Sequence, residues 1–578
     1  MHEPKVWAPA ARRVELVRGD GERVELAPGP GGWWSDTGLR LAAGEEYAFA
    51  LDGGPPLPDP RARAQPRGVH GPSAVVDLGA LRWTDAGWRP PPLGAGVVYE
   101  LHPGTFTPQG TFAAAIDKLE HLVELGVTHV ELMPSCEFAG QRGWGYDGVL
   151  LFAPHQAYGG AQGLAALVDA CHARGLAVLM DVVWNHFGPE GNYLSRFGPY
   201  FEGGAPTPWG EGPNLDGPWS DEVRRLFLDH ALELLRDYHL DGLRVDAVDA
   251  FVDRRALHFL EELAGEVAAL SVELGRELVL IGESGLNDPR LVRPREAGGL
   301  GFHAAWSDDL HGALHALLTG EVHGPWADYG RLADLAQALE RVFVHEGGWS
   351  HWRQRGHGRP LGPEVPAQRF LGYLQNHDQV GNRPGGERIG QLVPRGRLLA
   401  GAALVLLGPC VPMLFMGEEW AASTPFHYFT DLEPELGRAV ERGRRRGYAR
   451  MGFPARATGS DPQDPDTCAA SRLRWEERDA PAHREVLAWY RALIRLRRAR
   501  PDLLAGDLRR TRVRFDEQAG WLVMDRGRTA VAVNFGRAAQ RVALPRPGGT
   551  LLLGWPAGLA AAEGAVELPP DAVAVVGW

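Results

Sequence analysis

From Gly96 onward the chain repeats one local pattern: a helical segment, a glycine, a short apolar run and a polar loop. In one unit, residues 164–174 have helical periodicity, Gly175 follows, and 176–183 is an almost continuous apolar run. Strands buried on both faces of a parallel sheet have this composition. About eight such runs occur, near residues 97, 128, 178, 243, 279, 304, 370 and 411. This number favours an α/β fold with a (β/α)8 barrel over a doubly wound sheet.

The segments on either side of these repeats have a different pattern. Residues 1–90 contain short alternating stretches separated by Gly/Pro clusters, which is typical of a small β-sandwich. After Pro501 the chain returns to β-like segments. We therefore predict an N-terminal β-sandwich at 1–90, the barrel at 91–500 and a C-terminal antiparallel β domain at 501–578.

The bulk composition limits the partners. A formal net charge of -13 argues against nucleic acid or an anionic membrane, because both attract basic surfaces. No run approaches the length of a membrane span and no signal-peptide pattern is visible, so we expect a cytoplasmic protein. The four cysteines lack any CxxC spacing, so neither a disulfide framework nor a zinc site is expected.

Polar residues end four of the apolar, strand-like runs. The four endings are Asp181-Val-Val-Trp-Asn-His186, Arg244-Val-Asp246, Glu283 and Asn376-His-Asp378. Each alone has an ordinary structural explanation, such as a satisfied ion pair for Arg-x-Asp or a turn for Asn-His-Asp. In a (β/α)8 barrel, however, the carboxyl ends of all strands meet at the face that carries the active site. Their shared position therefore favours a site.

The order of the carboxylates suggests cleavage of a sugar–sugar bond. That reaction needs one carboxylic acid to protonate the leaving oxygen and one carboxylate to attack or to activate water. Arg244 lies two residues before Asp246 and therefore on the same side of a strand, which predicts an ionised nucleophile at Asp246. Glu283 has no adjacent cation in the sequence, so partial desolvation should raise its pKa and suit a general acid. Asp378 would stabilise the oxocarbenium-like transition state.

The same four segments resemble, in residue type, order and spacing, the four sequence blocks of the α-amylase family of retaining glycosidases. The resemblance implies Asp246 as nucleophile, Glu283 as acid/base and Asp378 as transition-state stabiliser. It also implies a substrate-binding group in which Tyr146 stacks on the sugar ring. That group consists of Tyr146, Asp181, His186, Arg244 and His377.

Other segments resemble one part of that family. Val6-Trp-Ala-Pro9 is similar to the N-terminal, carbohydrate-binding-like module of branching, debranching and trehalose-forming members. Tyr99-Glu-Leu-His-Pro-Gly104 narrows the resemblance to branching enzymes or maltooligosyltrehalose trehalohydrolases. Asn185-His-Phe-Gly-Pro-Glu-Gly-Asn-Tyr193 and Asn376-His-Asp-Gln-Val-Gly-Asn-Arg383 look like the trehalohydrolases.

This resemblance implies a hydrolase of trehalose biosynthesis that needs no cofactor. It would cleave the α-1,4 bond next to the terminal trehalose of maltooligosyltrehalose, and its pathway partner would be a maltooligosyltrehalose-forming enzyme. Two alternatives stay open. One is a 1,4-α-glucan branching enzyme, which would pass the glycosyl group to another glucan. The other is a glucan-binding protein with an inactive barrel, although the intact Asp246, Glu283 and Asp378 argue against it.

The chain departs from the family pattern after the nucleophile. Asp249 stands where trehalohydrolases more usually carry His, and it is a candidate substrate-binding residue on the leaving-group side of the cleft, with its contact there left open. Asp308, Asp309 and Gln379 are further candidates for that side, with loop-capping roles as the alternative. Asn185 corresponds to a calcium-holding position of many α-amylases, but no other ligands are recognisable, so no metal is predicted.

Overall fold

Eight parallel strands form a closed barrel at the centre of the computed structural model, which describes residues 2–36, 38–201, 203–454, 457 and 459–578. The strands follow one another around the barrel in chain order, and the last pairs with the first. They are β9 (Val98–Leu101), β10 (His129–Leu132), β13 (Ala177–Val182), β16 (Gly242–Val245), β17 (Val279–Gly282), β18 (Ala304–Trp306), β21 (Phe370–Gly372) and β22 (Val411–Phe415). The predicted barrel is confirmed.

Alternate residues of these strands belong to two different cores. Val98, Leu179 and Ile281 lie in one buried cluster made mainly of strand residues. Their neighbours in the chain, such as Tyr99 and Met180, join the larger core that includes the surrounding helices. Side chains of a strand point alternately to its two faces, so the first cluster fills the barrel and the second lies between barrel and helices.

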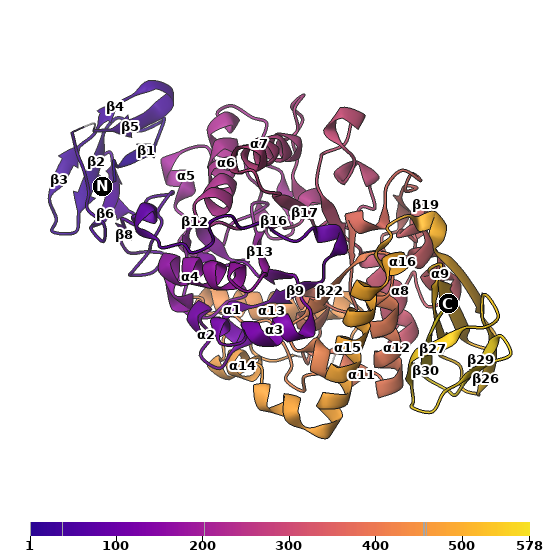
Figure 1. The fold of residues 1–578 in the computed structure, drawn as a ribbon. Helices are drawn as coiled ribbons and strands as arrows, with labels where there is room; N and C mark the ends of the chain where they lie inside the picture. Colours follow the sequence, from indigo (N-terminus) through magenta and orange to yellow (C-terminus); the bar gives the residue numbers. More distant parts are fainter. Residues whose placement is uncertain (1, 37, 202, 455–456, 458) are drawn as a thin grey trace.

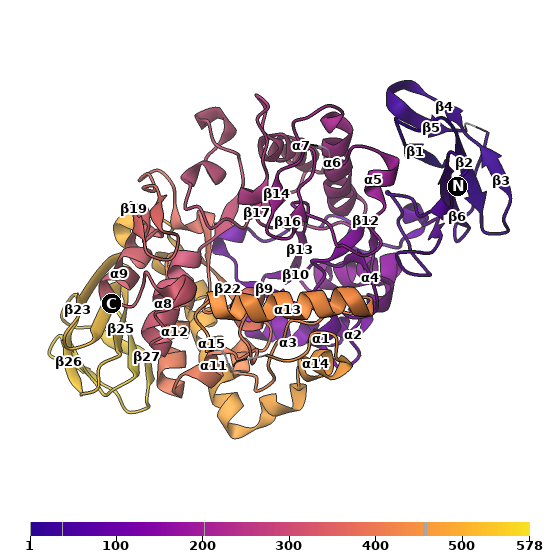
Figure 2. The same ribbon diagram turned by 180° about the vertical axis from the view of Figure 1, so that it is seen from behind.

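Helices cover the outside of the barrel (Figures 1 and 2). The helical spacing of Phe112, Ile116, Leu119 and Val123 predicts one helix, but the structure has two, because the helix is interrupted at Asp117–Lys118. Gly126 ends the second helix with a positive φ of 97°. The helices are α1 (Pro103–Phe106), α2 (Phe112–Ile116), α3 (Leu119–Leu125), α4 (Gly160–His172), α5 (Leu194–Phe197), α6 (Ser220–Arg236), α7 (Phe259–Leu274), α8 (Asp308–Thr319), α9 (Leu332–Arg341), α10 (His377–Gly381), α11 (Ile389–Leu392), α12 (Arg395–Leu406), α13 (Pro434–Arg450), α14 (Pro465–Ala470), α15 (Pro481–Ala499) and α16 (Pro501–Leu504).

Antiparallel sheets flank the barrel at opposite ends of the molecule (Figure 1). The N-terminal part has a sheet of order β1-β5-β4 and a second of order β3-β2-β6-β7, in which β8 also pairs with β6. Its strands are β1 (Lys5–Trp7), β2 (Val14–Arg18), β3 (Arg23–Glu25), β4 (Ala27–Pro28), β5 (Trp33–Ser35), β6 (Glu46–Leu51), β7 (Pro56–Leu57) and β8 (Ser73–Ala74).

The C-terminal part has a sheet of order β23-β24-β25-β30-β27 and another of order β26-β29-β28. Its strands are β23 (Arg512–Asp516), β24 (Trp521–Asp525), β25 (Thr529–Asn534), β26 (Gln540–Ala543), β27 (Thr550–Trp555), β28 (Ala561–Ala562), β29 (Ala565–Leu568) and β30 (Ala572–Gly577). These sheets confirm the predicted fold class, while domain boundaries near residues 90 and 500 remain a proposal.

Short two-stranded hairpins lie in the loops around the barrel. They are β11 (Cys136–Phe138) with β12 (Gly148–Pro154), β14 (Pro206–Thr207) with β15 (Gly210–Glu211), and β19 (Glu346–Ser350) with β20 (Arg355–Gly358). Among the described residues, no helix is long and apolar enough to cross a membrane.

Candidate active site

Arg244 is the centre of a charged cluster at the carboxyl ends of the barrel strands. It lies on β16 and its side chain is 0% exposed. Its Nη1 is 2.7 Å from both carboxylate oxygens of Asp181 and 2.8 Å from Oδ1 of Asp246. Its Nη2 forms an ion pair of 2.8 Å with Oε2 of Glu283. Asp181 stands directly opposite Arg244 in the pairing of β13 with β16, so strand register brings these groups together.

Glu283 has a different environment from the one we predicted. The expectation that no cation adjoins it is wrong, because Arg244 reaches it from the neighbouring strand. Its Oε2 also accepts a hydrogen bond of 2.9 Å from the backbone N–H of Ala247. Burial alone would raise the pKa of Glu283, but Arg244 and this N–H outweigh it and lower the pKa.

Asp246 shows the opposite shift. Burial, acting against the attraction of Arg244, raises the pKa of Asp246 well above its ordinary value, and the negative charge of Glu283 adds to the rise. This geometry therefore favours a proton on Asp246 and an ionised Glu283, which is the reverse of the sequence-based prediction. The two carboxyl groups are coupled and titrate as a pair.

Asp378 lies in the first turn of α10, beside a buried ion pair that the sequence did not reveal. The Asn376 side chain caps this helix and accepts from the N–H of Asp378. His377 Nδ1 is 2.5 Å from Oε1 of Glu100, and its Nε2 is 3.6 Å from Oδ1 of Asp378. Burial alone would lower the pKa of His377, but Glu100 and Asp378 raise it to about 9. His377 is therefore a cation at neutral pH. Glu100 could have been identified from the sequence, because it is a carboxylate inside the apolar strand 98–101.

Tyr146 and His186 form one wall of the site. The Tyr146 hydroxyl donates a 2.5 Å hydrogen bond to Asp181, and its ring stacks on His377 with centroids 5.1 Å apart. His186 Nε2 is 3.0 Å from the carbonyl oxygen of Tyr146, and burial lowers the pKa of His186 to about 4. The ring of Trp209, which is 55% exposed, stacks on His186. Sequence reasoning missed Trp209 because it stands in an irregular Gly/Pro-rich loop.

A cavity of about 210 Å³ extends from the carboxylates towards α8. Glu283, Asp308, Asp378 and Gln379 contribute to its walls, together with aromatic and basic side chains that include Trp352 and Arg353. Burial, reinforced by Glu283, raises the pKa of Asp308 to about 7. The Tyr373 hydroxyl donates to Asp308 over 2.8 Å.

The leaving-group candidates fall into different positions. Gln379 lines the cavity, but its Oε1 accepts from the backbone N–H of Asn376 and so also caps α10. Asp249 is exposed, and it is not among the described residues that line the cavity.

Asp309 does not have the surroundings of a substrate ligand. One carboxylate oxygen accepts from the Tyr329 hydroxyl over 2.7 Å. The other accepts from Asn287 Nδ2 and from the backbone N–H groups of Val344 and His345. Because both oxygens are occupied and the side chain is buried, these contacts favour the loop-capping alternative, in which Asp309 holds the segment before β19.

Asn185 stands at the position that the resemblance links to calcium, and the described residues supply no carboxylate cluster for a metal there. Asn185 is buried, and neither polar atom of its amide has a hydrogen-bond partner among the described residues. Those residues contain no group of three or more His, Cys, Asp or Glu side chains that could hold a metal ion. Calcium prefers several oxygen ligands, usually including carboxylates. The donors present do not fit such a site.

Comparison with known protein families gives two matches. Residues 77–199 match the family described as "Alpha amylase, catalytic domain". Residues 506–575 match "Domain of unknown function (DUF3459)".

Curated relatives cover nearly the whole chain. The Malto-oligosyltrehalose trehalohydrolase of Arthrobacter ramosus is 50% identical over 95% of both chains. That of Mycobacterium tuberculosis (strain ATCC 25618 / H37Rv) is 47% identical over 96% of both. The 1,4-alpha-glucan branching enzyme of Pseudomonas putida is 34% identical, over 59% of this chain and 53% of its own.

Solved structures share the fold. A "Putative alpha Amylase from Salmonella typhimurium" superposes with a TM-score of 0.90 and 38% identity, covering 100% of this chain and 97% of that one. A Group B Streptococcus pullulanase in complex with maltotetraose has a TM-score of 0.74 at 18% identity, covering 100% and 86%. The second likeness is one of fold alone.

Proposed function

The chain belongs to the malto-oligosyltrehalose trehalohydrolase family of α-amylase-type glycoside hydrolases, and from this premise we propose that it releases trehalose from maltooligosyltrehalose. The bond cleaved is the α-1,4 linkage next to the terminal trehalose unit. The other product is a shorter maltooligosaccharide.

The observation that carries the proposal is the contact of Arg244 with both Asp246 and Glu283. Two carboxyl groups that touch one guanidinium are closely spaced. Retaining glycosidases use a pair about 5–5.5 Å apart, whereas inverting enzymes leave about 6.5–9.5 Å for a water molecule. The geometry therefore supports retention of anomeric configuration.

The reaction proceeds in two displacements. Asp246 attacks the anomeric carbon while Glu283 gives its proton to the departing oxygen of trehalose, so the glycosidic bond breaks as the Asp246–carbon bond forms. Glu283 then takes a proton from water, and the resulting attack on the same carbon frees Asp246. Asp378 and the His377 cation hold the sugar hydroxyls during both steps.

The mechanism needs the proton on Glu283, whereas the contacts described above favour a proton on Asp246, so the proton has to move when substrate binds. We propose that the incoming glycosidic oxygen separates Glu283 from Arg244, so that burial then dominates and raises the pKa of Glu283. Asp246 keeps its contact with Nη1 of Arg244 and passes its proton to Glu283. The pair thereby reaches the protonation that the chemistry requires.

The substrate also implies where and with what the enzyme works. We propose a cytoplasmic enzyme whose substrate comes from a maltooligosyltrehalose-forming enzyme. The branching reaction is not favoured, because similarity to the P. putida branching enzyme covers only 59% of this chain.

Chromatography of products from maltooligosyltrehalose and from plain maltooligosaccharide of equal length tests the proposal, with Asp246→Asn as the inactive control. We expect trehalose from the first substrate and much slower release of maltose from the second. A rise in α-1,6 linkages would instead identify a branching enzyme. Glucan affinity without any product would identify a binding protein.

A further inference from the structure

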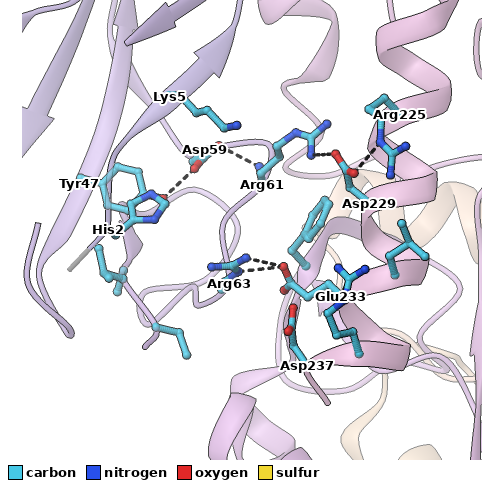
Figure 3. Close-up of a pocket in the computed structure, with 16 residues that line it drawn as sticks. His2, Lys5, Tyr47, Asp59, Arg61, Arg63, Arg225, Asp229, Glu233 and Asp237 are labelled. Carbon is cyan, nitrogen blue, oxygen red and sulfur yellow. Dashed lines mark hydrogen bonds and ion pairs between the residues drawn. The ribbon is translucent and has the colours of Figure 1, made fainter. Parts of the chain in front are cut away.

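A second cavity, which shares no lining residue with the cavity beside Glu283, lies between the N-terminal sheets and α6 (Figure 3). Its volume is about 360 Å³. Small-molecule sites typically measure about 300–1,000 Å³. We call it the α6 cleft. One wall consists of residues from β1, β6 and the segment 59–63, and the other wall belongs to α6.

Ion pairs fix the two walls of the α6 cleft relative to each other. Arg61 Nη1 is 2.7 Å from Asp229, and Arg63 donates to one oxygen of Glu233 through Nη2 at 2.7 Å and Nε at 2.9 Å. Arg225, on the same helix, donates to the other oxygen of Asp229 over 2.6 Å. Figure 3 shows the Arg61–Asp229 and Arg63–Glu233 pairs bridging the gap. The cleft is therefore preformed, which lowers the entropic cost of binding a ligand.

Polar atoms in the α6 cleft lack partners. Oε1 of Glu233 is buried and has no hydrogen-bond partner among the described residues, although Oε2 of the same carboxylate is paired with Arg63. Nε2 of His2, on the opposite wall, is likewise buried without a partner among them. Buried polar groups are nearly always hydrogen-bonded in folded proteins, so these atoms call for a ligand or ordered water.

The charges around the cleft nearly cancel. Five basic side chains face four carboxylates, and burial lowers the pKa of His2, so that it adds no charge at neutral pH. The basic residues are Lys5, Arg61, Arg63, Arg225 and Arg236, and the acidic ones are Asp59, Asp229, Glu233 and Asp237. A strongly charged ligand would be repelled by one set or the other. Interleaved donors and acceptors instead match a neutral, hydroxyl-rich molecule.

We infer that the α6 cleft is a second saccharide site, which binds a short neutral oligosaccharide without cleaving it. Hydroxyl groups of such a ligand donate to Oε1 of Glu233 and accept from N–H groups of the arginines that line the cleft. This inference does not depend on the substrate proposed for the barrel, because it rests on the cavity, its unpartnered atoms and its charge balance.

Hydrogen–deuterium exchange of the full-length Asp246→Asn protein with maltotetraose and with trehalose tests the inference. We expect peptides covering 59–63 and 225–237 to be protected by at least one of the two sugars. Peptides around Glu283 report occupation of the barrel separately, so failure of one site does not imply failure of the other. Inorganic phosphate serves as an anionic probe and should protect neither segment of the cleft.

Three variants locate the effect. Asp229→Ala removes a polar wall, and Val76→Trp fills the cleft from the opposite side; each should weaken protection of the cleft at least tenfold. Asp221→Ala is the matched control, since Asp221 is also on α6 and pairs with Arg255 over 2.6 Å but does not line the cleft. It should change protection less than twofold.

Any of three results overturns the inference. The first is no protection of the cleft peptides by either sugar at concentrations that protect the barrel peptides. The second is protection by phosphate alone. The third is protection that survives both Asp229→Ala and Val76→Trp in folded proteins.

Discussion

Arg244 contacts three carboxylates, and this sharing determines what each of them can do. One buried cation cannot neutralise three ionised carboxylates, in keeping with the raised pKa values of Asp246 and Asp181, and loss of the cation would leave buried negative charge without compensation. Its guanidinium also lies 4.0 Å from the centroid of the Trp306 ring, which restricts its movement. The side chain is thus fixed by four neighbours.

Arg244→Lys should therefore lower kcat/KM by about 100-fold or more, although it keeps the charge. A lysine ammonium is a compact point charge and cannot reproduce the planar fork of arginine. Steady-state kinetics on maltooligosyltrehalose measures the loss. Arg255→Lys, at an exposed pair with Asp221, is the matched control and should be neutral. Near-normal activity of Arg244→Lys would contradict the interpretation that a planar guanidinium is needed to contact several carboxylates at once.

Glu100→Gln should move the alkaline limb of the pH profile to lower pH. Glu100 raises the pKa of His377 to about 9, so the cation is present below that pH and lost as pH rises through it. Its contribution to stability is complete below about 6.5, the ordinary histidine pKa, and disappears through about 9. With Glu100 neutral, kcat/KM measured from pH 5 to 10 should decline at least one pH unit earlier. Glu435→Gln, in the outer helix α13, should leave the limb in place.

The residues that end apolar runs could be predicted from the sequence, whereas their partners could not. Asp181, Arg244 and Asp246 are visible because a charged residue interrupts an apolar pattern. The contact of Arg244 with Glu283 depends on the pairing of β16 with β17, which no local pattern encodes. This is why the predicted pKa directions of Asp246 and Glu283 were reversed. Glu100 was missed for the same reason, since its partner His377 lies far along the chain.

At the scale of elements, the short helix α10 carries the candidate site residues His377, Asp378 and Gln379 and depends on one close approach. A Cβ built on Gly381 would lie 2.0 Å from a ring carbon of Trp144. Trp144 in turn contacts the rings of Tyr146 and His377. The glycine therefore lets α10 sit against the wall of the site.

Gly381→Ala should destabilise the protein by about 1–3 kcal/mol, as overpacking of a rigid core does. It should also lower kcat, because α10 must shift and take Asp378 with it. Thermal inactivation and steady-state kinetics measure the two effects. Gly443→Ala is the control: this glycine lies inside α13, and a Cβ there would meet nothing within 4 Å. Equal behaviour of the two variants would refute the packing argument.

Helix positions were easier to predict than helix boundaries. The apolar face of residues 112–123 is real, but the chain breaks into α2 and α3 at Asp117–Lys118. The spacing of apolar residues shows which side chains face the core, but it does not show where one helix ends and the next begins. The barrel was predictable because its strands are uniformly apolar and each is followed by a polar loop.

At the scale of the whole molecule, Arg526 joins the C-terminal sheets to the barrel. Its guanidinium is buried and donates to the carbonyl oxygens of Leu407 at 3.1 Å and Ala505 at 2.7 Å. Burial lowers the pKa of Arg526 to about 10. The side chain thus satisfies carbonyl groups at the foot of the barrel from the adjoining sheet.

Arg526→Met should shorten the half-life at elevated temperature and expose the 500–510 segment to proteolysis. Each carbonyl left buried without a donor costs about 1–3 kcal/mol. Activity at low temperature should be unchanged, because the site is at the other end of the barrel strands. Arg528→Met, at an exposed position of the same connection between β24 and β25, is the control. Unchanged proteolysis of Arg526→Met would argue against this attachment.

The closure of the barrel has a consequence for how the chain is made. Val98 of β9 pairs with Met413 of β22, so the first and last strands meet only after some three hundred intervening residues have been synthesised. Until then β9 keeps an unpaired edge of the kind that promotes aggregation. Pairings of such long sequence separation also form slowly. Slower translation or lower temperature during expression should therefore raise the yield of folded enzyme more than any change to the finished molecule's surface.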